Sequence, residues 1–394
     1  MSNSDHGRRN FIKLLGSAVA GASLASCGKK DAATAGGGGA RDGEMNILCW
    51  EGYNTESVLG PFRKKFAGIS LKAESGTDDP SMINKLRAGE IKVWDLINLN
   101  QCWARDDMYK DKLIMPLNQE RFMPYLEKMM HWFYDKEKGV NPFAKSPDGK
   151  DLIGMIQRFG PLSFVVDTKK IAKATAEEQG WNLFLDPAMK GKYGLMAYDN
   201  WNVMHIAITA GLNPFKKLTP EEIEAYKKTC VTIFAGAKLI TADMVQMNQA
   251  LVNGEIDAYY SGGTYTASTA RFEGHTNVYA ISPLKGPVDG KGAMQWFEVT
   301  SLVNNPTPTP RAADFLEFVQ QPDICKSVAF AEGTFNPVAQ MAQPEVFGKF
   351  NKKELEALQW DALEEEMNRS VDYQVCPDND LLTSIYTEAK RTKA

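Results

Sequence analysis

Residues 45–67 read MNILCWEGYNTESVLGPFRKKFA, and this stretch decides the fold class. Its first part, residues 46–50, is a short apolar run of the kind that forms a buried strand. In its second part, from Thr55 to Ala67, apolar side chains recur with the spacing of one helix face; they are Val58, Leu59, Phe62 and Phe66. A strand followed directly by an amphipathic helix predicts an α/β protein.

The same alternation continues along the chain. Further strands are predicted at residues 70–74, 94–98, 152–158, 163–167, 194–198, 256–260, 278–281 and 298–303, and helices at residues 79–89, after Asn200, at 311–320 and at 352–368. The 394 residues exceed the roughly 250 to 300 at which one hydrophobic core stops growing. We therefore expect doubly wound sheets divided between two lobes.

The composition argues against several classes of protein. The 45 basic and 49 acidic residues give a formal charge of −4 and form no basic stripe that could follow a phosphate backbone, so no nucleic-acid partner is expected. No cysteine lies in a C-x-x-C pair, and the histidines are far apart in sequence, so no metal site is expected; the histidines are His6, His131, His205 and His275. The cysteine pairing stays open.

Motifs for catalysis are also missing from the sequence. It contains no Gly-x-Ser-x-Gly elbow, no His-Glu-x-x-His helix, no phosphate-binding loop and no dinucleotide fingerprint. Tyr260-Ser261-Gly262-Gly263 comes nearest to an elbow but lacks the glycine before the serine. We therefore expect a protein that is not an enzyme and that holds no cofactor.

The first 44 residues are predicted to serve export and anchoring. Arg8-Arg9-Asn10-Phe11-Ile12-Lys13 resembles a twin-arginine signal, and Leu24-Ala25-Ser26-Cys27 resembles a lipobox that lipidates Cys27. Residues 1–26 would form the signal peptide, and the Gly-rich residues 27–44 would form a tether. The predicted location is the periplasm or the surface of the cell envelope, with the protein held to the membrane at Cys27. A cleaved leader without lipidation is the alternative.

Aromatic and acidic residues follow several of the predicted strands. They occur at Trp50–Tyr53, Asn100–Trp103, Tyr198–Asn202, Tyr259–Tyr260 and Trp296–Glu298. In open α/β sheets, ligands bind beyond the carboxyl ends of the strands. Aromatic faces attract ammonium groups and carboxylates anchor them, so these strand ends predict a cleft for a small cation with an apolar body. The alternative is that the aromatic residues belong to the core.

The order of these motifs resembles the extracellular solute-binding proteins of ABC importers, most closely the spermidine/putrescine-binding group. The similarity runs from about Met45 to the carboxyl end, through Trp50–Tyr53, Asp95–Ile97, Trp181–Phe184, Pro187–Lys192, Asn253–Tyr259 and Ala312–Asp323. It implies a two-lobed, periplasmic-binding-protein-like fold of type II, with two crossovers near residues 157–161 and 294–298 and a cleft between the lobes. Lobe 1 would comprise residues 45–157 and 297–343, and lobe 2 residues 158–296 and 344–394.

The resemblance also implies a ligand site. Its members would be Trp50, Glu51, Tyr53, Asn100, Trp103, Asp199, Asn202, Tyr260, Trp296, Glu298 and Gln374. Asp199 and Glu298 would pair with the ammonium groups of a polyamine. The sequence departs from the group's pattern at Gly52 and Asn202, where acidic residues are expected, and at Asn100 and Cys102, where a Ser/Tyr pair is expected.

The implied function is capture of putrescine, spermidine or a related amine for delivery to an ABC permease, by a protein expected to be a monomer. A solute-binding protein of the same fold with a different small organic solute is a close alternative, since a monoamine or basic amino acid derivative needs fewer carboxylates. A secreted cofactor-dependent enzyme is a third, less favoured possibility.

Overall fold

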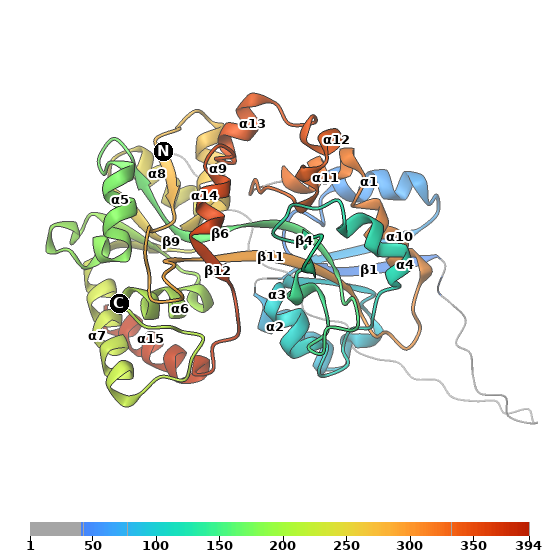
Figure 1. Cartoon of the computed structure of the whole chain (residues 1–394), viewed down its shortest axis with the longest axis horizontal. Helices are drawn as coiled ribbons and strands as arrows, with labels where there is room; N and C mark the ends of the chain where they lie inside the picture. The colour runs from blue at the N-terminus through green and yellow to red at the C-terminus, as the bar shows by residue number, and fades with distance from the viewer. Residues whose placement is uncertain (1–40, 42, 77, 332, 394) are drawn as a thin grey trace, which may run out of the picture. The chain divides into compact units, whose positions relative to one another are not determined.

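The computed structural model describes residues 41, 43–76, 78–331 and 333–393 (Figure 1). The predicted signal peptide, the lipidation site Cys27 and most of the tether lie outside these residues. The strands are β1 (Glu44–Cys49), β2 (Ser70–Ser75), β3 (Leu96–Asn100), β4 (Tyr134–Asp135), β5 (Gly139–Val140), β6 (Met155–Asp167), β7 (Tyr193–Met196), β8 (Ala237–Thr241), β9 (Ala258–Gly263), β10 (Val278–Ile281), β11 (Ala293–Leu302) and β12 (Ser370–Asp372).

Helices follow most of the strands, as the sequence predicts for an α/β protein. They are α1 (Glu56–Lys65), α2 (Asp79–Arg87), α3 (Gln101–Trp103), α4 (Gln119–Leu126), α5 (Lys173–Gln179), α6 (Asp199–Thr209), α7 (Pro220–Gly236), α8 (Met244–Val252), α9 (Thr264–Phe272), α10 (Pro310–Phe318), α11 (Pro322–Ala329), α12 (Pro344–Phe347), α13 (Lys352–Ala357), α14 (Leu363–Asn368) and α15 (Asn379–Lys393).

Ten of the strands belong to one mixed sheet with the order β2-β1-β3-β11-β6-β9-β7-β8, while β10 pairs with β6 and β12 with β11. At one end β1 runs parallel to β2 and β3, and at the other end β7 runs parallel to β8 and β9. The two parallel ends are joined only through β6 and β11 within this order. This is the two-lobed, doubly wound fold with two crossovers that the sequence predicts.

The two crossover strands β6 and β11 lie side by side and run antiparallel (Figure 1). The carboxyl half of β11 pairs with β3, whereas the carboxyl half of β6 pairs with β9 and β10. The strands predicted separately at residues 152–158 and 163–167 therefore fall on one element, which begins at Met155. Every residue of β6 is buried, including Gly160 and Pro161, which in sequence look like a break.

The predicted helix over residues 352–368 is wrong, because the structure has two helices there, α13 and α14. Gln359 between them has φ +50°, a left-handed backbone that a continuing helix does not allow. Its side-chain amide accepts a hydrogen bond from Ala280 N (2.8 Å) and donates one to Ala280 O (3.1 Å). This pairing with strand β10 fixes the turn at Gln359. Because Ala280 is distant in sequence, the residues around Gln359 do not indicate the turn.

The cysteines of the described body are all buried, and none of them forms a disulfide; they are Cys49, Cys102, Cys230, Cys325 and Cys376. No helix in the described ranges has the length and apolar character that crossing a membrane requires. The same ranges contain no group of three or more His, Cys, Asp or Glu residues arranged to hold a metal ion.

A buried acid lies just before β12, the short strand that pairs with the start of β11. Glu366 in α14 is 2 % exposed, and hydrogen bonds from Ser282 to its carboxyl group oppose the effect of burial. Burial raises the pKa of Glu366 to about 7. The folded protein therefore holds this proton more tightly than the unfolded chain, whose Glu pKa is about 4.3.

We predict that Glu366→Gln stabilises the protein at pH 8 by about 1 to 3 kcal/mol and changes little at pH 4. With the folded pKa raised, ionising Glu366 costs stability as pH rises from about 4 to 7, and glutamine removes that cost. Urea unfolding of both proteins at a series of pH values measures the difference. The exposed Glu364→Gln in the same helix is the control, and equal pH profiles for wild type and Glu366→Gln would contradict the prediction.

Candidate functional site

A cavity of about 480 Å³ lies where several strands end, which is a suitable size for a small organic molecule. Segments after β1, β3 and β7 and the crossover strands β6 and β11 contribute its walls. We call it the aromatic cavity; it is lined by Trp50, Glu51, Gly76, Asn100, Arg158, Leu162, Ala197, Tyr198, Asn200, Trp201, Ala242, Met244, Tyr265, Trp296, Glu298, Thr334 and Asn336.

Five aromatic side chains form most of the apolar wall: Trp50, Tyr198, Trp201, Tyr265 and Trp296. Tyr265 stands between two of them, with ring centroids 6.2 Å from Tyr198 and 5.8 Å from Trp296. The Tyr265–Trp296 pair meets edge to face, which is a favourable geometry for aromatic rings. These rings offer faces that can cover methylene groups and attract a positive charge.

The most buried charges of the cavity are Arg158 of β6 and Glu298 of β11. Arg158 Nε donates to both carboxylate oxygens of Glu298 at 3.1 and 3.0 Å, and Nη2 donates to Oε1 at 2.7 Å. Tyr53 donates its hydroxyl hydrogen to Glu298 Oε2 at 2.6 Å. Burial opposes the guanidinium charge, but Glu298 outweighs this and the pKa of Arg158 is raised, so Arg158 stays charged.

An irregularity of the backbone sets the position of the Arg158–Glu298 pair. The register between β6 and β11 shifts between Phe297 and Val299, the two neighbours of Glu298. Such a bulge turns a side chain away from the regular alternation of the strand. Gly52 completes the arrangement: at φ +101° a Cβ atom would lie 2.8 Å from Ala331 Cβ and 3.0 Å from Arg158 Nη1. Only glycine fits between them.

Glu51 is the charged lining residue that has no ion-pair partner within the described residues. It is exposed, and no described residue forms an ion pair or hydrogen bond with its carboxylate. Burial, and to a lesser degree the Glu51 charge, raises the pKa of Tyr198 and of Tyr265. The Glu51 carboxylate therefore lies close enough to both rings for its charge to act on their hydroxyl groups.

Asn100 reaches the cavity from the end of β3 and is held by Asp79 at the start of α2. Asp79 accepts hydrogen bonds from Asn100 N at 2.9 Å and from Asn100 Nδ2 at 2.8 Å. Burial raises the pKa of Asp79 to about 7. Because both hydrogen bonds fix the amide, Asp79 is a positioning residue for Asn100.

Of the residues predicted from sequence, Trp50, Glu51, Asn100, Trp296 and Glu298 line the cavity. Tyr53 lies directly behind it, with its hydroxyl group on Glu298. The segments at the ends of β1 and β3 thus meet the crossover strand β11 at this cavity. Glu298 differs from the prediction in one respect, because Arg158 and Tyr53 already occupy its oxygens.

The other five predicted residues do not line this cavity. Asp199 forms an ion pair with Lys390 (2.8 Å) and accepts a hydrogen bond from Tyr386 (2.7 Å), both from α15. Asn202 is fully buried, where its amide donates to Met196 O and to the Tyr386 hydroxyl. Tyr260 is a core residue bonded to Thr209, Trp103 donates to Tyr373, and Gln374 is exposed. Each of the first four therefore has a structural partner in place of a ligand.

The sequence prediction missed Arg158, Tyr198, Tyr265, Trp201 and Met244 as cavity residues. Arg158 had a usable signal, since an arginine within a continuous apolar strand must be buried and needs an acidic partner. Tyr198 and Trp201 lie in a strand end that the sequence had singled out. Tyr265 and Met244 had no such signal, because they come from the first turns of α9 and α8.

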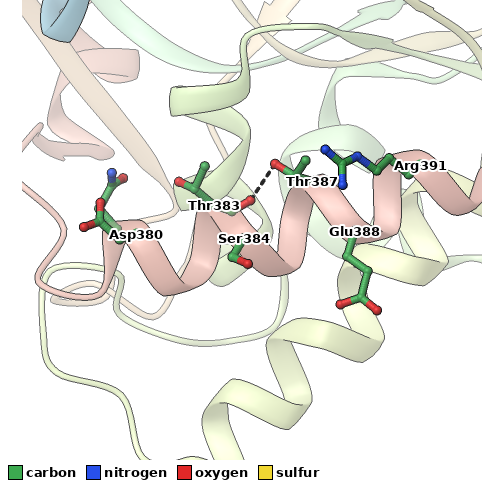
Figure 2. Close-up of a pocket in the computed structure, with 7 residues that line it drawn as sticks. Asp380, Thr383, Ser384, Thr387, Glu388 and Arg391 are labelled. Carbon is green, nitrogen blue, oxygen red and sulfur yellow. Dashed lines mark hydrogen bonds between the residues drawn. The ribbon is translucent and has the colours of Figure 1, made fainter.

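A second hollow, of about 580 Å³, runs along α15 (Figure 2). All its lining residues belong to that one helix and none is buried; they are Asn379, Asp380, Thr383, Ser384, Thr387, Glu388 and Arg391. Figure 2 shows Thr387 bonded to the backbone of Thr383 within the helix. A polar groove formed by one helix lacks convergent groups, so the aromatic cavity is the better candidate site.

The family of the protein follows from its sequence. Residues 58–354, more than half of the chain, match the family described as bacterial extracellular solute-binding protein. The chain belongs to this family. Solute-binding proteins of ABC importers bind a small molecule and deliver it to a membrane permease, and they are transport proteins, not enzymes. Their extracellular character places this solute-binding protein outside the cytoplasm. Among curated proteins, none matches the chain.

Solved structures share the fold at low sequence identity. A Listeria monocytogenes protein described as a spermidine/putrescine ABC transporter has TM-score 0.67 and 15 % identity, covering 89 % of this chain and 100 % of its own. A binding protein from A. tumefaciens B6 in complex with glucopine has TM-score 0.59 and 12 % identity over 88 % and 99 %. The Pasteurella haemolytica ferric ion-binding protein A has TM-score 0.56 and 13 % identity over 88 % and 98 %. One fold therefore serves very different solutes.

We predict that Glu298→Gln destabilises this solute-binding protein by about 3 kcal/mol, because it leaves the buried Arg158 charge without its counter-ion. The double variant Arg158→Met/Glu298→Met should lose much less, since no charge remains buried. Denaturant unfolding followed by tryptophan fluorescence measures both. Glu317→Gln is the matched control: it breaks the pair with Arg121, whose two side chains are 34 % and 31 % exposed, and should cost less than about 1 kcal/mol. A Glu298→Gln protein as stable as this control would contradict the prediction.

Proposed function

We propose that this protein captures a small organic ammonium compound in the aromatic cavity for uptake through an ABC permease. The observation that carries the proposal is the Glu51 carboxylate, which has no partner within the described residues and shares a cavity with five aromatic side chains. An ammonium group pairs with such a carboxylate, while the rings cover the apolar body attached to it.

Burial of methylene groups and cation–π contacts supply only part of the free energy that binding needs. Four buried methylene groups at ~0.8 kcal/mol and two cation–π contacts at ~1 kcal/mol contribute ~5 kcal/mol. A dissociation constant of ~1 μM corresponds to ~8 kcal/mol. The charge-assisted hydrogen bond between the ammonium group and Glu51 must therefore supply the remainder and offset the entropy cost of association as well.

A polyamine such as putrescine or spermidine is the specific ligand that the resemblance implies, and the Listeria monocytogenes neighbour is named for these two amines. The charges of the cavity favour fewer ammonium groups. Glu298 is neutralised by Arg158, and Asp199 is paired with Lys390 away from the cavity lining. Within the described lining, Glu51 is the carboxylate left for a ligand, so we favour a solute whose net charge is lower than that of a diamine.

The lobes provide the means of capture. We propose that residues 45–157 and 297–343 form lobe 1, that residues 158–296 and 344–394 form lobe 2, and that they close about the crossovers when the solute binds. The cavity walls come from both sets of residues, since Glu51 and Asn100 belong to the first and Tyr198 and Tyr265 to the second. Closure about such crossovers is the hinge motion of binding proteins.

We predict that Glu51→Gln weakens binding of the amine that binds best by tenfold or more, because the amide keeps the shape of the side chain and loses its charge. Isothermal titration calorimetry with butylamine, phenethylamine, putrescine and spermidine gives the reference affinities. Glu56→Gln, a change at an exposed carboxylate paired with Arg63 outside the cavity, is the control. Unchanged affinity in Glu51→Gln would contradict the proposed site.

We also propose that the chain is exported by a twin-arginine signal and lipidated at Cys27. Fractionation of cells tests this: wild type and Cys49→Ala should sediment with membranes, and Cys27→Ala should appear in the soluble fraction. Cys49 is a buried cysteine of β1, so its replacement controls for loss of a thiol. Membrane-bound Cys27→Ala would show that the protein is held there by another means.

A further inference from the structure

The aromatic cavity contains buried hydrogen-bond donors that no described residue satisfies. They are Trp50 Nε1, Arg158 Nη1 and Trp296 Nε1, against one acceptor without a partner on the same lining, Asn336 Oδ1. A buried donor without an acceptor costs roughly 1 to 3 kcal/mol, so such groups in a native site meet water or a ligand. Three donors on one cavity favour a ligand that brings oxygen acceptors.

The contacts of Arg158 leave its Nη1 atom without a hydrogen-bond acceptor among the described residues. Its Nε and Nη2 are used by Glu298, and its guanidinium lies over the ring of Tyr53 at 4.9 Å. The side chain is 2 % exposed, so it has no freedom to seek another partner. Gly52 packs against this nitrogen, since a Cβ atom there would lie 3.0 Å from Nη1 and 2.8 Å from Ala331 Cβ.

The charge distribution is divided between two places. Arg158, whose charge Glu298 balances, offers an N–H donor that it cannot lose, and Glu51 offers a negative group without a partner within the described residues. A simple diamine would satisfy Glu51 with one end but would bring a donor, and a positive charge, to the donors of Arg158 and the tryptophans. A carboxylate there would form charge-assisted hydrogen bonds instead.

We propose that the solute is amphoteric, with its ammonium group at Glu51 and a carboxylate that accepts hydrogen bonds from Arg158 Nη1 and from the indole N–H groups of Trp50 and Trp296. This rests on the proposed function and names its substrate class: an amino acid or an amino acid derivative with an apolar or aromatic body.

Matched ligand pairs test the proposal, each an amino acid and the amine formed by removing its carboxylate: ornithine and putrescine, lysine and cadaverine, phenylalanine and phenethylamine. Titration calorimetry on the whole protein gives the affinity ratio within each pair. We expect the carboxylated member to bind at least tenfold more tightly in the pair that fits best. For the first two pairs this is the opposite of what attraction to Glu51 alone would give, since the diamine carries more positive charge than the amino acid.

Variants assign the preference to the donors. Arg158→Met/Glu298→Met removes the guanidinium without leaving a buried charge, and should bring the ratio close to one. Trp296→Phe keeps the ring and removes one donor, and should lower the ratio severalfold. Arg121→Met/Glu317→Met removes an Arg–Glu pair outside the cavity and should leave the ratio unchanged. Thermal melting of each variant confirms that it is folded.

The outcomes separate this inference from the proposed function. Amines that bind as tightly as their amino acids, or more tightly, overturn the amphoteric solute and leave ammonium capture standing. A carboxylate preference that survives Arg158→Met/Glu298→Met in a folded protein overturns the assignment to Arg158. If no member of any pair binds at millimolar concentration, ammonium capture fails and the amphoteric solute fails with it.

Discussion

The buried ion pair between Arg158 and Glu298 is the interaction on which the cavity depends. It joins the two crossover strands at the one place where their register shifts. Tyr53, which follows β1, donates a hydrogen bond to the same Glu298 carboxylate. Burying two charges is costly, and hydrophobic residues of similar volume would often give equal or greater stability. We therefore interpret the pair as a device that fixes geometry, since it holds one guanidinium edge toward the cavity.

The pair also accounts for one departure of this chain from the polyamine-binding pattern, the glycine at position 52. Where that pattern has an acidic residue before the tyrosine of the first strand end, this chain has Gly52, and the structure puts the Arg158 guanidinium beside it. Glu298, the residue that would meet an ammonium group, is instead the counter-ion of Arg158. A neutral Arg158–Glu298 pair thus stands where the pattern has carboxylates that are free to meet a ligand.

The parts of the fold that depend on local sequence could be predicted. The first strand and helix follow from apolar spacing, and Trp50, Glu51 and Asn100 line the cavity because the ends of parallel strands lie at one edge of a sheet. What failed depends on distant contacts. Asp199 was placed in the site by its position at the start of α6, but its carboxylate is claimed by Lys390 in a helix at the far end of the sequence. Gln359 interrupts the predicted helix because its side chain pairs with Ala280, and nothing in the sequence near Gln359 indicates this contact.

Three of the eight tryptophans, Trp50, Trp201 and Trp296, line the aromatic cavity. Indole emission responds to the polarity of its surroundings and to nearby charges, so a solute that displaces water from these rings changes the light that the protein emits. The natural chain thus carries its own optical reporter of occupancy. Solutes of any chemistry can be screened by it without a label, a radioactive ligand or a reconstituted transporter.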